Sequence, residues 1–265
     1  MKDALWNPIY DSTAKHFLDL ANTNTILDLG CGIGMWTWTL KRLRKKAKIV
    51  GLDSDASALA QAAKNLGFEL ELVRADASFL PFRKGCFDLA TCRRLLINLG
   101  PRKRRKVVKE MTRVTKVGGL VASAEPSLQT NRANHFSTIR GNLRFSRRLE
   151  IAISGTDFTL GPKVAYLFIR AGLRNVDVFA YLWVTSYLPP RYHNLWLSTV
   201  VHGGGFVHAL STVRPPPQGK KWEPLLREAK RLDREVRSQR KRKVLASVTA
   251  IPVFLTKGMK PLPLS

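Results

Sequence analysis

The stretch TILDLGCGIGMWTW, residues 25–38, decides the fold. Its first five residues form an apolar run that predicts a buried strand, and helical spacing begins at Met35. Glycines at positions 30, 32 and 34 lie between the two, so the pattern predicts a strand, a tight turn and a helix. Asp28 stands just ahead of these glycines, and its charge restricts the ligands that the turn can bind.

Two common ligands of glycine-rich turns fit this one poorly. A dinucleotide-binding turn needs glycine at its first, third and sixth positions, and the spacing of the glycines here is different. A phosphate-binding P-loop needs Gly-Lys-Ser/Thr, but no lysine follows until Lys41. The Asp28 carboxylate would also repel a phosphate. A ligand that carries positive charge removes this objection.

Short apolar runs alternate with helical patterns through the first half of the chain, as they do in βαβ units that form a parallel sheet. Helices are predicted to begin at Met35, Ala56 and Pro101, and the second of them should end at Gly67. Strands are predicted at 25–29, 48–53, 69–73, 87–92 and 119–125. The order predicts an α/β fold with a doubly wound sheet.

The second half of the chain is less regular. The patterns predict a helix at 161–173 and strands at 175–184 and 246–256. Segments 126–160 and 185–246 lack the composition of linkers, so we expect both to be insertions into a single domain that covers residues 1–265. A charged helix near the end should turn an apolar stripe inward and its basic groups outward; the stripe is Trp222, Leu225, Leu226, Ala229, Leu232 and Val236.

The charge balance is unusual for a chain of 265 residues that is 45% apolar. With 45 basic and 19 acidic side chains, the formal net charge is +26, which favours polyanions such as RNA, DNA or an anionic membrane surface. The alternative is that the basic groups form solvated helix faces. The three cysteines form no CxxC pair, and no metal site is predicted. Because neither a signal peptide nor a membrane span is recognisable, we expect a reduced, cytoplasmic protein.

The segment LDLGCGIG, residues 27–34, resembles the first motif of the class I S-adenosylmethionine (SAM)-dependent methyltransferases. SAM fits the electrostatic argument because it has an ammonium group, a sulfonium and no phosphate. The resemblance implies that Asp28 lies near the methionine amino group of SAM. It also implies that the backbone passes close to the cofactor at Gly30, Cys31, Gly32 and Gly34. The alternative is a tight turn without a ligand.

Three later segments resemble further motifs of this family. VGLDSDA places Asp53 where the family binds both ribose hydroxyls, although Asp55 competes for this role unless it caps the next helix. VRADASFLPF implies that Asp76 accepts a hydrogen bond from the adenine amino group and that the Ala77 amide faces the ring. FDLATCRRLLINL implies that Arg93 lines the methionine end, unless this arginine is structural.

Two segments flank this match. EMTRVTKVGG resembles the family pattern before the fifth strand, with Val117 where proline is usual, and we expect Glu110 and Arg113 there to be structural and to pair the helix with the sheet. IYDSTAKHF resembles the N-terminal segment that covers the cofactor in many relatives, which makes Tyr10 a candidate contact or an ordinary packed aromatic. The resemblance implies a seven-stranded Rossmann-like sheet with helical insertions after the fifth and sixth strands, a SAM-binding core at 25–125 and a lid at 1–24.

The methyl acceptor is a separate question. Transfer from a sulfonium is an in-line displacement, so alignment supplies much of the acceleration and no universal side chain is required. Where the acceptor is a hydroxyl, a base helps. Glu125 is the favoured catalytic candidate because strand ends border the cleft in open α/β sheets. The histidine candidates are His135, His193 and His202. Cys92 should be a buried core thiol.

Three functions remain open from the sequence. LPF after Asp76 and the apolar content of the second insertion resemble the subgroup that methylates quinones, sterols and natural products, which favours a small-molecule acceptor. The alternative is a tRNA or rRNA methyltransferase that uses its basic clusters. These clusters are KRLRKKAK at 41–48, PRKRRK at 101–106, RFSRRLE at 144–150 and REVRSQRKRK at 234–243. The third function is an interaction module without turnover.

Overall fold

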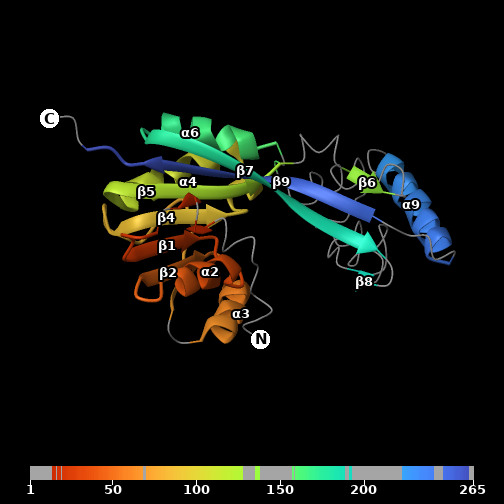
Figure 1. Cartoon of the computed structure of the whole chain (residues 1–265), viewed down its shortest axis with the longest axis horizontal. Helices are drawn as coiled ribbons and strands as arrows, with labels where there is room; N and C mark the ends of the chain where they lie inside the picture. Colours follow the sequence, from red (N-terminus) through yellow and green to blue (C-terminus); the bar gives the residue numbers. More distant parts are fainter. Residues whose placement is uncertain are drawn as a thin grey trace. The chain divides into compact units, whose positions relative to one another are not determined.

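A computed structural model gives the fold (Figure 1). It describes residues 14–15, 17–18, 20–67, 70–127, 135–137, 157, 159–188, 191–192, 223–241 and 247–262. The chain divides into two compact units, which we call unit 1 and unit 2. Unit 1 comprises residues 1–126, 160–180 and 254–265, and unit 2 comprises residues 127–159 and 181–253. Unit 2 therefore begins and ends near the predicted insertions, and their inclusion in a single domain stays a prediction.

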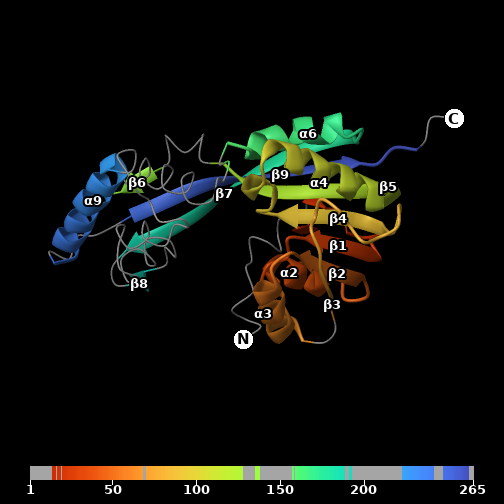
Figure 2. The same cartoon turned by 180° about the vertical axis from the view of Figure 1, so that it is seen from behind.

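The sheet of unit 1 has the strand order β3-β2-β1-β4-β5-β9-β7 in its described residues. Strands β1 to β5 pair in parallel, as the alternation of strands and helices predicts. Figures 1 and 2 show the β9 arrow pointing opposite to that of β4, which makes the sheet mixed. The strands are β1 Thr25–Leu29, β2 Lys48–Asp53, β3 Glu71–Arg74, β4 Phe87–Arg93, β5 Thr115–Pro126, β7 Arg174–Leu188 and β9 Ser247–Met259. The predicted doubly wound, Rossmann-like fold class is confirmed.

Helices flank this sheet and bury its apolar residues. α4 packs against α6, and Figure 2 shows α4 in front of β4 and β5. The helical elements of unit 1 are α2 Met35–Leu43, α3 Ala56–Leu66, η2 Leu96–Asn98, α4 Pro101–Val114, η3 Gly161–Lys163 and α6 Val164–Arg170. The core between them contains fully buried aliphatic side chains, among them Ile26, Leu27, Leu29, Leu52 and Leu89. α3 ends at Gly67, and Pro101 begins α4, as the sequence predicts.

The described part of unit 2 contains strands as well as the predicted helix. β6 His135–Ser137 pairs antiparallel with β9, and β8 Arg191–Tyr192 pairs antiparallel with β7. Helix α9, Glu223–Lys241, buries Ala229 and Leu232 as predicted. Leu226 does not follow the prediction, because its side chain is exposed. Trp222 and the side chains of Leu225 and Val236 lie outside the described residues.

Among the described helices, none is long and apolar enough to cross a membrane.

Candidate functional site

The glycines of the turn after β1 differ in the space around them. Gly30, Gly32 and Gly34 all have positive φ angles, of 64°, 53° and 90°. A Cβ atom on Gly30 would lie 2.9 Å from Leu95 Cδ1, and one on Gly34 would lie 2.3 Å from Leu66 Cδ1. A Cβ atom on Gly32 would meet nothing within 4 Å. Gly30 and Gly34 therefore allow internal packing, whereas Gly32 borders open space that a ligand can occupy.

Asp28, in β1, is a buried acid with an unsatisfied oxygen. Its side chain is 1% exposed, and Thr37 Oγ1 of α2 donates a 2.6 Å hydrogen bond to Oδ2. Oδ1 is buried and has no hydrogen-bond partner among the described residues. Burial raises the pKa of Asp28 to about 7, while the Thr37 hydrogen bond and the charge of Arg93 oppose this shift. An ammonium group of a ligand would supply the missing donor and favour the ionised carboxylate. The residue present thus fits the cation of SAM.

Asp53, at the end of β2, links two neighbouring turns. Its Oδ2 accepts a 2.8 Å hydrogen bond from the Gly32 amide, and its Oδ1 accepts a 3.0 Å hydrogen bond from the Asp55 amide. Asp55 itself caps α3, because its carboxylate accepts hydrogen bonds from the Ser57 and Ala58 amides. Asp55 thus caps α3 and Asp53 faces the glycine turn, and the ribose-binding role of Asp53 stays a prediction.

Cys31 belongs to the framework of this turn. Its amide donates a 3.0 Å hydrogen bond to the Leu52 carbonyl oxygen, which ties the turn to β2. The side chain is 7% exposed, and a Cβ atom on Gly51 would lie 3.2 Å from its Sγ. Burial raises the pKa of the Cys31 thiol. Cys92 is likewise a free and fully buried thiol, so the prediction of a core cysteine is confirmed.

Asp76 begins the loop after β3 and has partners for both oxygens. Oδ1 accepts hydrogen bonds from the Ser78 amide at 2.8 Å and the Ser78 hydroxyl at 2.7 Å. Oδ2 forms a 2.8 Å ion pair with Lys103 Nζ of α4. The hydrogen bond from Lys103 and those from Ser78 lower the pKa of Asp76 to about 2. Asp76 is therefore ionised at neutral pH, and Ala77 beside it is 9% exposed.

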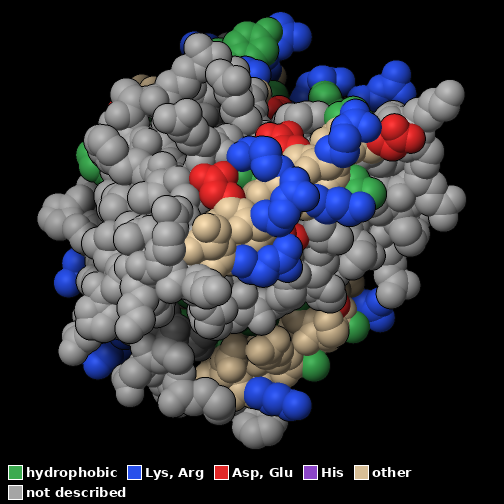
Figure 3. All heavy atoms as spheres, turned by 90° about the vertical axis from the view of Figure 1, so that its right-hand side faces the viewer, with side chains coloured by type: hydrophobic (Ala, Val, Ile, Leu, Met, Phe, Trp, Pro, Cys, Tyr) green, Lys and Arg blue, Asp and Glu red, His purple; other side chains and the backbone are tan. Residues whose placement is uncertain are grey.

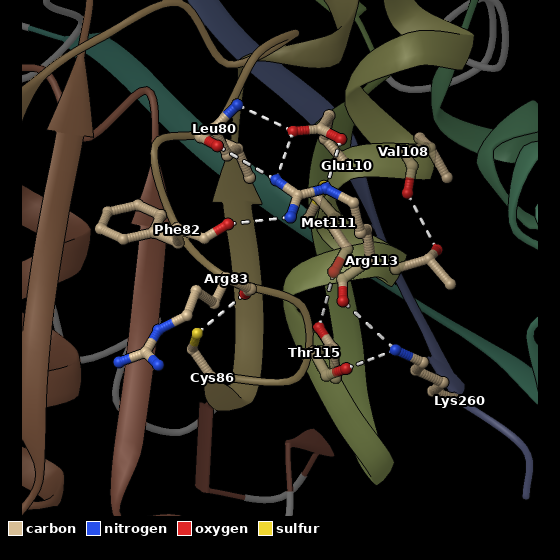
Figure 4. Close-up of polar contacts among 11 residues, drawn as sticks. Leu80, Phe82, Arg83, Cys86, Val108, Glu110, Met111, Arg113, Thr115 and Lys260 are labelled. Atoms are coloured by element: carbon tan, nitrogen blue, oxygen red, sulfur yellow. Dashed lines mark hydrogen bonds and ion pairs between the residues drawn. The ribbon is translucent and has the colours of Figure 1, made fainter.

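Glu110 and Arg113 of α4 hold the loop that follows Asp76 (Figure 4). Glu110 Oε2 accepts a 2.8 Å hydrogen bond from the Leu80 amide. Arg113 pairs with Glu110 and donates to the carbonyl oxygens of Phe82 at 2.8 Å and Leu80 at 3.0 Å. Each side chain stabilises the charged form of the other. The pKa of Glu110 is lowered and that of Arg113 is raised, in both cases chiefly by their mutual hydrogen bond. The structural role is confirmed, but the expected partner was wrong: these side chains join α4 to the loop at Leu80 and Phe82 and not to the sheet.

Glu125, near the end of β5, is surrounded by donors. Its Oε1 accepts hydrogen bonds from the amides of Leu95 at 3.2 Å and Leu96 at 2.9 Å, and Oε2 accepts one from Ile97 at 3.4 Å. The Ser123 hydroxyl lies 3.3 Å from Oε1. The side chain is 0% exposed, and burial raises its pKa to about 7. This geometry gives the carboxylate a bracing function for the turn at η2, and its catalytic role stays a prediction.

The other candidates are placed in part. Arg93 ends β4, and its charge acts on Asp28. His135 lies in β6 of unit 2, whereas Tyr10, His193 and His202 lie outside the described residues. No group of three or more metal-ligating side chains occurs in the part of the chain that the structure describes.

Two contacts were missed by the sequence reasoning. Thr37 reaches Asp28 because it lies on the buried face of α2. Its position three residues before the apolar Leu40, on the same side of the helix, is the signal that could have identified it. Lys103 reaches Asp76 across 27 positions of sequence, and nothing in its basic cluster distinguishes it from its neighbours.

Comparison with known proteins finds a matching protein family and one curated relative. Residues 26–119 match a protein family described as a methyltransferase domain. An uncharacterized protein of Haemophilus influenzae is 31% identical over 137 residues, which are 50% of this chain and 51% of that protein. The chain therefore spans about half the length of this curated relative.

Three solved structures resemble the fold over most of the chain. A Bacillus halodurans protein, provisionally assigned as a methyltransferase, gives a TM-score of 0.59 at 15% identity and covers 95% of this chain and 99% of its own. Phosphoethanolamine N-methyltransferase 2 of Haemonchus contortus, solved with SAM, gives 0.56 at 14% identity over 96% of this chain and 52% of its own. The [4+2]-cyclase SpnF gives 0.56 at 17% identity over 96% and 80%. Residues 26–119 thus match a methyltransferase-domain family, and they lie in a sheet with the Rossmann-like fold of the methyltransferase structures that the chain resembles.

Proposed function

We propose that the protein is an enzyme that transfers a methyl group from SAM to a small-molecule acceptor. The observation that carries this proposal is the buried Oδ1 of Asp28, which precedes the turn at Gly32 and finds no hydrogen-bond donor in the part of the chain that the structure describes. A buried acceptor without a donor costs free energy, and the ammonium group of SAM would remove that cost. SAM carries no phosphate, so the same carboxylate does not repel it.

The remaining contacts of the cofactor are proposed at neighbouring acids. Asp53 uses one acceptor site of each oxygen for backbone amides, and a carboxylate offers about four such sites, so two remain for the ribose hydroxyls. Asp76 is held ionised by Lys103 and would accept from the adenine amino group, with the Ala77 amide facing the ring. The proposed contacts at Gly30 and Cys31 would come from their backbone alone, since both residues are packed internally.

When bound, the cofactor would supply a methyl group that an acceptor can take as the carbon–sulfur bond breaks and the sulfur becomes neutral. The chain itself would bind and orient the cofactor: Asp28 and Arg93 would hold the methionine end, and Asp53 would hold the ribose. Alignment of the reacting groups provides much of the acceleration, so a dedicated base is not required for every acceptor. We assign Glu125 a positioning role, because its carboxylate already accepts hydrogen bonds from three backbone amides.

RNA is the second candidate acceptor, favoured by the exposed basic side chains of α4 and α9. A cofactor-binding domain that works as an RNA- or protein-interaction module without turnover is the third candidate, because a fold does not by itself determine an activity. The small-molecule assignment rests on the resemblance of LPF at 80–82 and of the insertion 185–246 to the quinone and sterol subgroup.

Calorimetric titration with SAM tests the cofactor assignment. We expect heat of binding from the wild type and much weaker binding from the Asp53→Ala variant. Asp55→Ala is the matched control, because it removes a neighbouring acid that caps α3 and should leave SAM affinity within about twofold. No heat from the wild type, or equal affinities for wild type and Asp53→Ala, would contradict the assignment.

Incubation with radiolabelled SAM and fractionated cell extract tests the acceptor class. Label in the small-molecule fraction supports the proposal, and label in RNA favours the second candidate instead. SAM binding without transfer to any fraction would favour the third. An Asp28→Asn sample provides the comparison, because its weaker SAM binding should reduce the label at a SAM concentration that is limiting for the variant.

A further inference from the structure

Helix α4 exposes five basic side chains on one face. With Phe79 of the preceding loop they form what we call the α4 patch: Phe79, Arg102, Lys103, Arg105, Lys106 and Lys109. The basic positions repeat at intervals of three and four, so they occupy one side of the helix. Val107, Val108 and Met111 are buried on the opposite side. The charges are thus concentrated on the solvent-facing side of one element of unit 1.

This concentration of charge is unfavourable within the helix itself. Basic residues three and four positions apart repel one another, and cations in a first helical turn oppose the helix dipole. The first turn of α4 contains no acidic residue. Glu110, the acid of this helix, is engaged by Arg113 and Leu80. Within the described residues, the ion pair of the α4 patch joins Lys103 to Asp76. An external polyanion would offset this repulsion.

Phe79 adds an aromatic surface to the charge. Its side chain is 67% exposed, and Lys106 Nζ lies 3.0 Å from the centroid of its ring. The loop around it is held in place, because the Phe79 amide donates to the Asp76 carbonyl oxygen and the Leu80 amide donates to Glu110. The ring is therefore presented in a defined position beside the cations rather than packed into the core.

We propose that the α4 patch binds single-stranded nucleic acid. Cations that track a phosphate backbone and an exposed aromatic ring on which a base can stack are the two elements of such surfaces. An anionic membrane fits less well, because a membrane-binding helix needs a broad apolar face and the solvent side of α4 is basic. This binding is a property of the surface alone and does not depend on the proposed methyl transfer.

Helix α9 provides the matched control. Its exposed stripe is also basic (Figure 3), with Arg227, Lys230, Arg231, Arg234 and Arg237 at helical spacing. Arg227 pairs with Glu223 and Arg231 pairs with Glu235, so acids interrupt this stripe. Each helix exposes five of these basic side chains, but acids pair with two of those on α9, and only the α4 group adjoins Phe79.

The experiment measures fluorescence anisotropy of a labelled 20-nucleotide oligo(U) strand with the full chain, without SAM, across a salt series. We expect the triple variant R102Q/K106Q/K109Q to bind at least about tenfold more weakly and to lower the salt slope by about 2. Phe79→Ala should weaken binding at least about fivefold with an unchanged slope, and Phe79→Tyr should restore it. The control variant K230Q/R234Q/R237Q should change affinity less than about twofold.

Three outcomes would overturn the proposal. Equal losses in the α4 and α9 triple variants would mean that net charge alone attracts the strand. No binding of oligo(U) at low salt would mean that the patch has no affinity for nucleic acid. Tighter binding to vesicles of phosphatidylserine and phosphatidylcholine than to oligo(U), lost in the α4 variant, would identify a membrane surface. Thermal unfolding and SAM titration of each variant separate these results from misfolding and from failure of the proposed enzyme function.

Discussion

Asp28 and Glu125 are two carboxylates with nearly the same environment and different partners. Asp28 is 1% exposed and Glu125 is 0% exposed, and burial raises the pKa of each to about 7. Glu125 accepts hydrogen bonds from three backbone amides, so both of its oxygens are satisfied. Asp28 accepts one from Thr37 and keeps a second oxygen without a donor.

The difference indicates which acid serves the fold and which serves a ligand. A buried carboxylate is tolerated where hydrogen bonds compensate for its burial, and Glu125 meets this condition through the turn at η2. Leu95 in that turn packs against Gly30, so Glu125 also braces the glycine turn indirectly. Asp28 does not meet the condition in the protein alone. Its missing donor is what a cationic cofactor would provide.

The largest effect is expected for Glu125→Gln. Its amide nitrogen cannot accept the backbone hydrogen bonds that one carboxylate oxygen accepts now. We expect the free energy of unfolding to fall by about 3 kcal/mol, as is typical when a buried hydrogen-bonded network loses a partner. Urea unfolding measures this loss, and the affinity of the folded variant for SAM should change less than about threefold. A stable variant with greatly weakened SAM binding would show that the two acids have the opposite roles.

The next largest effect is expected for Asp28→Asn. The variant loses one charge-assisted hydrogen bond to the ammonium group, so SAM affinity should fall about 30-fold, or about 2 kcal/mol. Its free energy of unfolding should change by less than about 1 kcal/mol, because the hydrogen bond from Thr37 is the one protein contact of this carboxylate that the substitution can affect. Thr37→Val is the control, since it alters the same carboxylate and removes no charge. Unchanged SAM affinity in Asp28→Asn would refute the assigned role.

The pH dependence of stability should separate the two acids further. Both pKa values are raised in the folded protein, from 3.8 and 4.5 to about 7, so the folded state binds more protons between these limits. Stability should therefore fall as pH rises from about 4 to about 7 and change little above, with a slope of up to about 1.4 kcal/mol per pH unit for each acid. Asp28→Asn should remove the part of this slope that comes from Asp28. Denaturant unfolding at several pH values would show a flat profile if neither acid were protonated in the folded protein.

SAM affinity should have its own pH profile. Ionised Asp28 attracts the ammonium group, so affinity in the wild type should rise as pH increases through about 7. The profile should persist in Glu125→Gln and disappear in Asp28→Asn. Calorimetry across this range checks the difference, and a profile that follows Glu125 instead would contradict the comparison.

The sequence predicted residues whose role follows from local pattern. The glycine turn, the strand before it and the helix after it are determined by neighbours within a few positions, and so is the helix cap that the sequence offered as the alternative role of Asp55. The contacts of Glu125 with Leu95 and Leu96 join positions about thirty residues apart, and only the packing of β5 against the turn after β4 brings them together. Proximity to the end of a strand suggested catalysis, and it could not reveal which donors surround the side chain.

The same limit applies to the apolar stripe of α9. Helical spacing placed Leu226 with Ala229 and Leu232, but the spacing gives only an angular range. Leu226 lies at the margin of that range and is 38% exposed, while Asp233 next to Leu232 is 8% exposed. Which of these marginal side chains is buried depends on the segments that pack against the helix and not on the helix itself.

A smaller effect is expected where the carboxylate is partly exposed. Arg113→Lys would lose the paired hydrogen bonds to Glu110 and the contacts with Leu80 and Phe82, because an ammonium cannot reproduce the guanidinium fork. We expect the free energy of unfolding to fall by about 1 kcal/mol and SAM affinity to fall about threefold, since the loop that presents Asp76 is loosened. Thr112→Ser, at the neighbouring position of α4, is the control. A loss of SAM affinity as large as that of Asp28→Asn would mean that Arg113 and Glu110 belong to the binding site itself.

The smallest effect is expected at the exposed end of the series. Lys103 and Asp76 form an ion pair with side chains 48% and 45% exposed, where water screens the attraction. Lys103→Gln should therefore change the free energy of unfolding by less than about 0.5 kcal/mol. The pKa of Asp76, now lowered to about 2, should rise toward its ordinary value while the Ser78 hydrogen bonds keep it below. A carboxyl NMR titration measures this shift, with Lys109→Gln as the control. If Lys103→Gln destabilised the protein as much as Glu125→Gln, the burial of an acid would not determine how much its partners contribute to stability. The contrast between Asp28 and Glu125 would then depend only on whether their hydrogen bonds are satisfied.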